Sequence, residues 1–316
     1  MSFELRTLVV GLAAFAGTGL LVSALVPMLI SRSARSAAGV RSLFLMRLRL
    51  LPVTAALLAS AAATIAFLMF ESRKAGETVS WSMIALASVG GLLLSLSAWR
   101  WYRLAVTTRR TTRAWFASAQ PISLEGIAVP TLAVDTNFPI VAVVGLFRPR
   151  LIIARSVLAT CTADELRAVL AHEQAHLNRR DNLRRLALIA TPDVLAWLPI
   201  SARLFSAWYE AAEEAADDNA ERTHHDGRLH LASALVKVAR IAAGTSLPPV
   251  VPAAALYTGS NLETRVRRLL APAAEPSGAR SGSTTVALVV AIAAIVFATG
   301  TPIVHEWIES AIHLLP

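Results

Sequence analysis

The chain contains four apolar segments long enough to cross a lipid bilayer, and this feature constrains its fold more than any other. A hydrocarbon core about 30 Å thick requires about 20 helical residues, because each residue rises about 1.5 Å. We therefore predict four transmembrane helices. The four segments are Thr7–Ile30, Leu50–Phe70, Trp81–Leu104 and Thr284–Val304.

The composition agrees with an integral membrane protein. Hydrophobic residues make up 55% of the 316 residues and charged residues 16%, against about 45–50% and about 25% in soluble proteins. This balance excludes a disordered chain, a collagen-like repeat and a coiled coil, and disfavours a purely soluble enzyme. The single cysteine, Cys161, cannot form an intrachain disulfide.

Arginines next to the apolar segments predict the orientation in the membrane. Residues 31–49 and 100–113 each contain five arginines and no acidic residue. Such stretches stay on the cytoplasmic side, so the net charge of +9 reflects topology, and we expect no direct contact with nucleic acid. The prediction is a multi-pass inner-membrane protein with its N-terminus outside. It comprises a three-helix region (1–104), a cytoplasmic domain (105–283), a fourth span (284–304) and an external tail (305–316).

The region between the third and fourth segments has mixed patterning. Three runs rich in β-branched residues predict a small antiparallel sheet: Ile127–Val134, Ile140–Leu146 and Arg150–Ala154. Thr162 and Glu165 match a capping box, which predicts a helix from there to about Asn178. That helix carries one apolar stripe, formed by Leu166, Val169, Leu170 and Leu177.

Two further segments follow the capped helix. Leu186–Ile200 is apolar but too short to span and is interrupted by prolines, so we predict a helix pair apposed to the bilayer. In this reading Trp197 and Trp208 lie near the lipid headgroups. A second helix is expected over about Ala202–Glu221.

The capped helix carries the sequence His172-Glu173-Gln174-Ala175-His176. Residues i and i+4 share one helix face, so two imidazoles can bind one Zn²⁺. Glu173 lies beside them and can accept a proton from water rather than bind the metal. Catalytic zinc sites use three protein ligands, so the motif predicts a third ligand downstream.

An acidic pattern on the second helix offers this ligand. A glutamate can bind the metal while an aspartate one turn later contacts the free nitrogen of a ligating histidine. Two registers fit this pattern, Glu213 with Asp217 and Glu214 with Asp218, and their spacing does not distinguish them.

The sequence resembles the BlaR/MecR-type membrane zinc metallopeptidases, which are relatives of the HtpX and prenyl-protein (CAAX) endopeptidases. The resemblance covers about residues 125–225. It rests on the segments 144–153, 165–176 and Arg179-Arg180-Asp181, and on an E-x-x-A-D-x-x-A pattern at Glu213–Ala220. It implies a mainly α, polytopic protein with a zincin-like α+β domain between spans three and four. It also implies that Glu213 is the third zinc ligand, of the gluzincin type, and that Asp217 supports a histidine.

The resemblance also implies an activity. We expect a zinc endopeptidase that cleaves a cytoplasmic protein, such as a transcriptional repressor in a signalling pathway. A membrane-protein quality-control protease and a non-catalytic zinc-binding scaffold remain as alternatives. Only twelve residues follow Val304, so we expect no penicillin-binding sensor in this chain, and a stimulus would come through a partner, a second copy or the spans.

Several other residues near the motif have open interpretations. Leu151–Ala154 is either an edge strand that pairs with a substrate peptide or part of a core hairpin. Arg265 and Arg267 either stabilise an oxyanion or, as we favour, form a basic patch facing solvent or lipid. We interpret His224 and His225 as surface residues. Arg180 and Asp181 are expected to pair with each other at the end of the motif helix.

Overall fold

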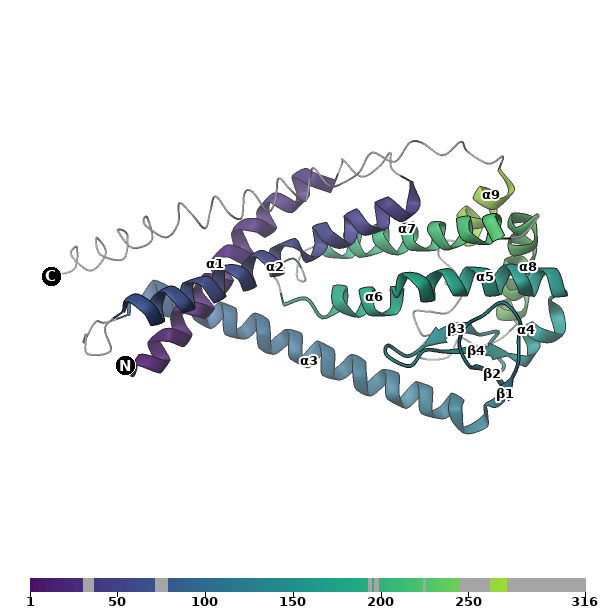
Figure 1. Ribbon diagram of the computed structural model, residues 1–316, viewed down its shortest axis with the longest axis horizontal. Helices are drawn as coiled ribbons and strands as arrows, with labels where there is room; N and C mark the ends of the chain where they lie inside the picture. The colour runs from purple at the N-terminus through teal and green to yellow at the C-terminus, as the bar shows by residue number, and fades with distance from the viewer. Residues whose placement is uncertain are drawn as a thin grey trace.

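The computed structural model describes residues 1–30, 37–71, 79–192, 195, 199–223, 226–244 and 262–271. Three long helices lie toward one end of an elongated molecule, and a small sheet with shorter helices lies toward the other (Figure 1). Each long helix is long and apolar enough to cross a membrane. The fourth predicted span and the tail, 284–316, lie outside the described residues. The long helices are α1 (Phe3–Ile30), α2 (Ala38–Phe70) and α3 (Trp81–Ser118).

Two of these helices extend well beyond the apolar segments. α2 begins at Ala38 rather than near Leu50, and α3 ends at Ser118 rather than near Leu104. The parts of the arginine-rich stretches from Ala38 to Arg49 and from Arg100 to Arg113 are therefore helical. Hydropathy marks only the part of a helix that suits lipid, whereas arginine and leucine also favour helix outside the bilayer.

Small residues allow the long helices to approach one another closely. A Cβ atom at Gly90 of α3 would lie 2.5 Å from the carbonyl oxygen of Leu12 in α1, so only glycine permits this crossing. Oγ of Ser60 in α2 donates a hydrogen bond to the carbonyl oxygen of Gly11 at 2.8 Å. These contacts hold the three helices together as one bundle.

The sheet is mixed rather than antiparallel throughout. Its strands lie in the order β1-β2-β4-β3, with β2 and β4 parallel and the two outer pairs antiparallel. The predicted antiparallel hairpin across Gly145, which has a φ of 106°, is confirmed, but the prediction of an entirely antiparallel sheet is wrong. The strands are β1 (Gln120–Ile122), β2 (Thr131–Val134), β3 (Val141–Val144) and β4 (Arg150–Ala154).

β4 lies inside the sheet and is not an edge. It is paired with β2 on one side and β3 on the other, and Leu151–Ala154 are fully buried. A continuous apolar run of this kind belongs to a strand covered on both faces. The reading of Leu151–Ala154 as a substrate-binding edge is therefore wrong, and the core reading is correct.

The predicted capped helix is present as α5 (Ala163–Arg179). Oγ of Thr162 accepts from the backbone N–H of Glu165, and Oε2 of Glu165 accepts from the backbone N–H of Thr162, so the capping box is confirmed. The other short helices are α4 (Arg155–Thr160), α6 (Asp181–Ile189), α7 (Pro199–Thr223), α8 (Gly227–Ala243) and α9 (Leu262–Leu270).

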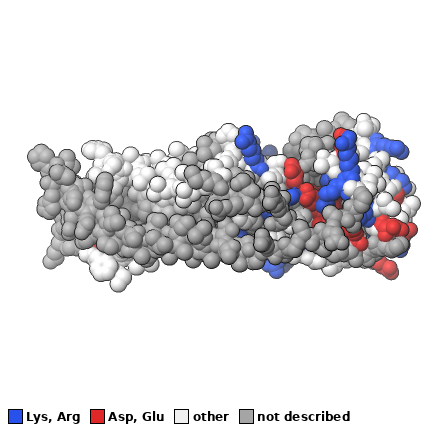
Figure 2. Space-filling model, turned by 90° about the horizontal axis from the view of Figure 1, so that it is seen from above, with Lys and Arg blue, Asp and Glu red and all other residues white. Residues whose placement is uncertain are grey.

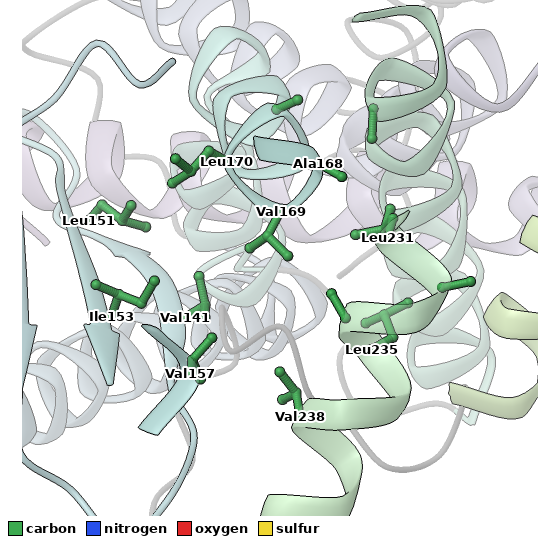
Figure 3. Close-up of a cluster of buried hydrophobic side chains, with 14 of the residues drawn as sticks. Val141, Leu151, Ile153, Val157, Ala168, Val169, Leu170, Leu231, Leu235 and Val238 are labelled. Carbon is green, nitrogen blue, oxygen red and sulfur yellow. The ribbon is translucent and has the colours of Figure 1, made fainter. Parts of the chain in front are cut away.

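The main core lies between the sheet, α5 and α8 (Figure 3). Val141 and Ile153 of the sheet, Val169 of α5, and Leu231 and Leu235 of α8 point into it and are all buried. This packing confirms the predicted apolar stripe of α5.

A second core joins the long helices to the domain. Leu45 and Leu48, in the polar extension of α2, pack with Leu204 and Trp208 of α7. Trp208 is buried there, so its predicted place among lipid headgroups is wrong. Residues 193–194 and 196–198, including Trp197, lie outside the described residues. The centre of the segment predicted to lie on the bilayer therefore also lies outside them.

Charge is distributed unevenly along the molecule. On the face shown in Figure 2, the coloured side chains of Lys, Arg, Asp and Glu gather at one end, and the described atoms toward the other end are almost all uncharged. This separation matches a bundle that lies in lipid and a domain that lies in water.

Candidate metal centre

Two helices from different parts of the chain form the candidate site. α5 presents His172 and His176 on one face, and α7 packs against α5 and presents Glu213 toward them. His172 and Glu173 are only 1% and 2% exposed. The two histidines are four positions apart, so one turn of α5 is enough to bring their rings together.

The ligating atoms lie at distances suited to a single metal ion. Nε2 of His172 lies 3.1 Å from Nε2 of His176. Oε2 and Oε1 of Glu213 lie 3.6 Å and 3.5 Å from those two nitrogens, respectively. Ligands placed about 2.0–2.1 Å from a tetrahedral ion are about 3.3 Å apart. The three side chains therefore fit a metal ion without rearrangement.

An aspartate supports each imidazole from behind. Oδ1 of Asp217 lies 2.9 Å from Nδ1 of His172, and Oδ2 of Asp181 lies 2.8 Å from Nδ1 of His176. A carboxylate at Nδ1 keeps the proton on that nitrogen, so the lone pair of Nε2 is directed toward the metal position. The sequence analysis anticipated Asp217 in this place but missed Asp181.

A turn at the end of α5 accounts for the position of Asp181. Arg180 has φ 53° and ψ 43°, which is left-handed backbone, and it separates the end of α5 from the start of α6 at Asp181. Asp181 then faces back toward His176 and also accepts from Arg179 at 3.1 Å and Arg184 at 3.3 Å. Among the described residues, Asp181 forms ion pairs with His176, Arg179 and Arg184 and none with Arg180, so the expected pairing of Arg180 with Asp181 is wrong. The sequence signal that could have identified Asp181 was its position as a polar residue directly after the C-terminus of the motif helix.

Arginines from α9 complete the far side of the site. Nη1 of Arg265 lies 2.9 Å from Oε2 of Glu213, and its Nη2 lies 2.7 Å from Oδ1 of Asp217. Arg265 is buried, so the reading that placed it in a basic patch facing solvent or lipid is wrong. Arg267, two residues later, is 78% exposed, as that reading required. His224 and His225 lie outside the described residues.

Glu214 takes a different direction from Glu213. Its Oε2 lies 2.7 Å from Nη2 of Arg41 in α2, and Arg268 of α9 lies nearby. Of the two registers that the sequence allowed, the structure brings Glu213 and Asp217 to the histidines, whereas Glu214 connects α7 to a long apolar helix. Adjacent residues on a helix point about 100° apart, which separates the two roles.

A small cavity of about 40 Å³ adjoins the histidine–carboxylate cluster. Glu173, His176 and Glu213 line it, together with Val143 of β3. One water molecule needs about 10–15 Å³ of such space, so the cavity has room for water next to Glu173. Its lining thus combines a candidate base with two candidate ligands.

Burial and neighbouring charges set the protonation of these groups. Burial raises the pKa of Glu173 to about 7, and the charge of Glu213 acts in the same direction. Burial lowers the pKa of His172, which keeps its ring neutral and able to bind a metal. Burial would also raise the pKa of Glu213, but the charges of Arg265, His176 and His172 together outweigh burial and hold that pKa below its usual value. Glu213 is therefore ionised and available as a ligand.

His176 behaves differently from His172. Burial opposes its charged form, but the contact with Asp181 and the charges of Glu213 and Glu173 outweigh burial and raise its pKa. A proton and a metal ion compete for the same Nε2 lone pair. The carboxylates that attract a proton to His176 also attract a divalent cation.

Apolar helices of spanning length, joined to two imidazoles and a carboxylate in metal-binding geometry, define a membrane protein with a candidate metal centre as the class of protein. Comparison with protein families identifies the family to which the chain belongs. Residues 21–269, more than half of the chain, match the family described as BlaR1 peptidase M56, and the chain belongs to this family. A search of curated proteins finds no significant match.

Proposed function

We propose that this protein is a zinc-dependent endopeptidase of the inner membrane that cleaves a cytoplasmic protein. One observation carries the proposal: the Nε2 atoms of His172 and His176 and a carboxylate oxygen of Glu213 lie within 4.8 Å of one another. Two imidazoles and one glutamate suit Zn²⁺ in a catalytic site, because they leave a fourth position open. When bound, zinc would polarise a water molecule and the peptide carbonyl.

The residues of the chain supply the proton transfers. Glu173, at the cavity, accepts a proton from the attacking water on a carboxylate oxygen and delivers it to the leaving amine. A base with a pKa of about 7 is ionised for much of the time at neutral pH and still able to release its proton. Asp217 and Asp181 keep the imidazoles oriented throughout.

The sheet suggests where the substrate backbone lies. β3 is an edge strand, and its Val143 lines the cavity. The carbonyl oxygen of Val143 accepts from Nδ2 of Asn182 at 2.8 Å, so this part of the edge is held in place. A peptide that passes Val143 at the end of β3 would lie beside Glu173, which lines the same cavity.

The orientation belongs to the same proposal. Arginines of α2 and α3 lie on the extensions that connect the apolar bundle to the domain, including Arg41, Arg47 and Arg109. Positive charge at this end of the helices favours a cytoplasmic domain. A repressor protein is then an accessible substrate, and cleavage would change gene expression; the bilayer is the other partner.

The test is the variant Glu173→Gln in cells, compared with the native protein. We expect zinc content to be unchanged and cleavage to fall by orders of magnitude, about 10²-fold or more. Quantitative proteomics would then show one stabilised DNA-binding protein. Many stabilised, misfolded membrane proteins would instead indicate quality control, and identical proteomes would indicate a scaffold. Retained cleavage by Glu173→Gln would refute its role as base.

Metal binding is tested separately. Replacing His172 by Ala removes one of three ligands, so we expect the purified variant to lose its zinc in elemental analysis. A matched control is His230→Ala on α8, which lies outside the candidate ligand set. Equal zinc in the native protein and in His172→Ala would rule out ligation by this residue.

A further inference from the structure

The cavity beside the candidate metal centre is lined by an arginine whose positive charge the proposed chemistry does not use. Arg185 of α6 lines the same cavity as Glu173, His176 and Glu213. It lies one turn beyond Asp181, so α6 carries it past the imidazole support and toward α7. The proposed roles of metal ligation and proton transfer leave Arg185 without a function.

Two aromatic rings hold the guanidinium of Arg185. Its Cζ lies 5.7 Å from the ring centroid of Phe205 and 5.8 Å from that of Tyr209. These residues are four apart on α7 and therefore present their rings on one face. Stacking of this kind fixes the plane of a guanidinium and leaves its N–H groups free to bind at their edge.

Arg185 has no carboxylate partner within the part of the chain that the structure describes. The neighbouring arginines Arg179 and Arg184 both form ion pairs with Asp181. Arg185 forms no ion pair with any described residue. Burial lowers the pKa of Arg185, with the charge of Glu213 acting against it. Desolvation without a paired anion is unfavourable, and an incoming anion would relieve it.

Two carboxylates that share the cavity with Arg185 are already paired with other arginines. Asp181 binds Arg179 and Arg184, and Glu213 binds Arg265. A divalent metal at the histidines would add positive charge beside them. The cavity of about 40 Å³ has room for a carboxylate group beside Arg185.

We propose that Arg185 forms a recognition subsite for an acidic side chain, Asp or Glu, of the protein substrate, next to the peptide bond that is cleaved. The planar guanidinium donates two parallel hydrogen bonds to the carboxylate, the geometry that arginine provides and lysine does not. This inference rests on the proposed peptidase function, and it makes Arg185 a determinant of specificity rather than a catalytic residue.

The test uses the full-length, zinc-loaded protein in detergent and a degenerate pool of decapeptides, with cleavage products identified by mass spectrometry. We expect the native protein to cut peptides with Asp or Glu enriched at one position relative to the cut. Arg185→Gln should lose the enrichment at that position alone. For a matched pair of peptides, kcat/KM for the Glu peptide should fall by about tenfold, which corresponds to about 1.4 kcal/mol, and kcat/KM for the Gln peptide should change little.

Two further variants separate recognition from folding. Arg203→Gln removes an exposed arginine of α7 that does not line the cavity, and it should keep the native preference. Arg185→Lys keeps the positive charge but lacks the planar pair of N–H donors, so it should retain part of the preference for acidic residues. An unchanged acidic preference in Arg185→Gln, or none in the native protein, would overturn the proposal, as would an equal loss of kcat/KM on both matched peptides.

A binding measurement distinguishes failure of this inference from failure of the peptidase function. If the zinc-loaded native protein cuts no peptide, the proposed function fails, and fluorescence anisotropy of two labelled decapeptide pools still tests Arg185. The pools differ only in carrying one Glu or one Gln. Tighter binding of the Glu pool, abolished in Arg185→Gln, would support the subsite; equal binding of both pools would refute it.

Discussion

Nη2 of Arg265 lies 2.7 Å from Oδ1 of Asp217, and both side chains are buried. Through its other nitrogen the same guanidinium reaches Glu213 at 2.9 Å. One arginine of α9 therefore offsets the negative charge of two carboxylates on α7. Asp217 in turn contacts His172, so Arg265 connects α9 to the candidate metal centre, and Arg268 of the same helix also reaches Asp217 at 3.4 Å.

Replacing Arg265 by Gln should destabilise the metal-free protein more than the zinc-loaded protein. Without the guanidinium, two buried carboxylates lose their cation, a change that typically costs about 3–5 kcal/mol. Zinc would supply positive charge to Glu213 and offset part of this loss. Thermal unfolding in detergent, with a chelator and with zinc, measures the difference. The control is Arg267→Gln on the exposed face of the same helix. If Arg265→Gln lowers the unfolding temperature equally with chelator and with zinc, the expectation is contradicted.

Asp181→Asn should weaken zinc binding by about tenfold to a hundredfold. The carboxylate of Asp181 holds the proton on Nδ1 of His176, and an amide supports that tautomer and the ring orientation less well. Competition with a chromophoric chelator measures the affinity. Asp164→Asn, at the exposed N-terminal turn of α5, is the control and should bind zinc as the native protein does. Native affinity in Asp181→Asn would show that Asp181 is not a support.

Glu165 predicts a pH dependence of stability. Burial would raise its pKa, but bonds from Lys237, Ser233 and the backbone of Thr162 outweigh burial and lower its pKa from 4.5 to about 2. The carboxylate therefore stabilises the fold above about pH 4.5, and this contribution is lost as the pH falls toward 2. Glu165→Gln should cost about 1.5–3 kcal/mol at pH 7.

The difference between native protein and Glu165→Gln should shrink as the pH is lowered from 7 toward 3, because Glu165 takes up a proton in the unfolded chain below about pH 4.5 while the folded protein still holds it ionised. Unfolding by denaturant in detergent at several pH values measures it. A difference that stays constant over this range would show that the ionised form of Glu165 does not contribute to stability.

Arg41 and Glu214 predict an energetic connection between the apolar bundle and the metal-site helix. Their 2.7 Å contact is partly buried, so a double-mutant cycle with Arg41→Gln and Glu214→Gln should give a coupling energy of about 0.5–1 kcal/mol. Chemical unfolding of the four proteins provides the values. Additive effects within error would mean that the pair carries no coupling.

Much of the fold follows from local patterns in the sequence. Apolar length predicts α1, α2 and α3, and the capping box predicts the start of α5, because these signals depend on residues close together in the chain. The ends of α2 and α3 were missed, since packing against α7 rather than hydropathy extends α2. The order of the strands was missed because a short apolar run does not specify its neighbour.

The candidate site divides in the same way. The sequence by itself determined that two imidazoles and Glu173 share a turn of helix, since a spacing of four residues on a helix leaves little freedom. The spacing left Glu213 and Glu214 open, and only the tertiary structure decided that Glu213 faces them, that Asp181 supports His176, and that Arg265 is buried beside Glu213. The contacts of Glu213 and Arg265 join residues about 40 to 50 positions apart and depend on how whole helices pack, whereas that of Asp181 depends on the left-handed turn at Arg180.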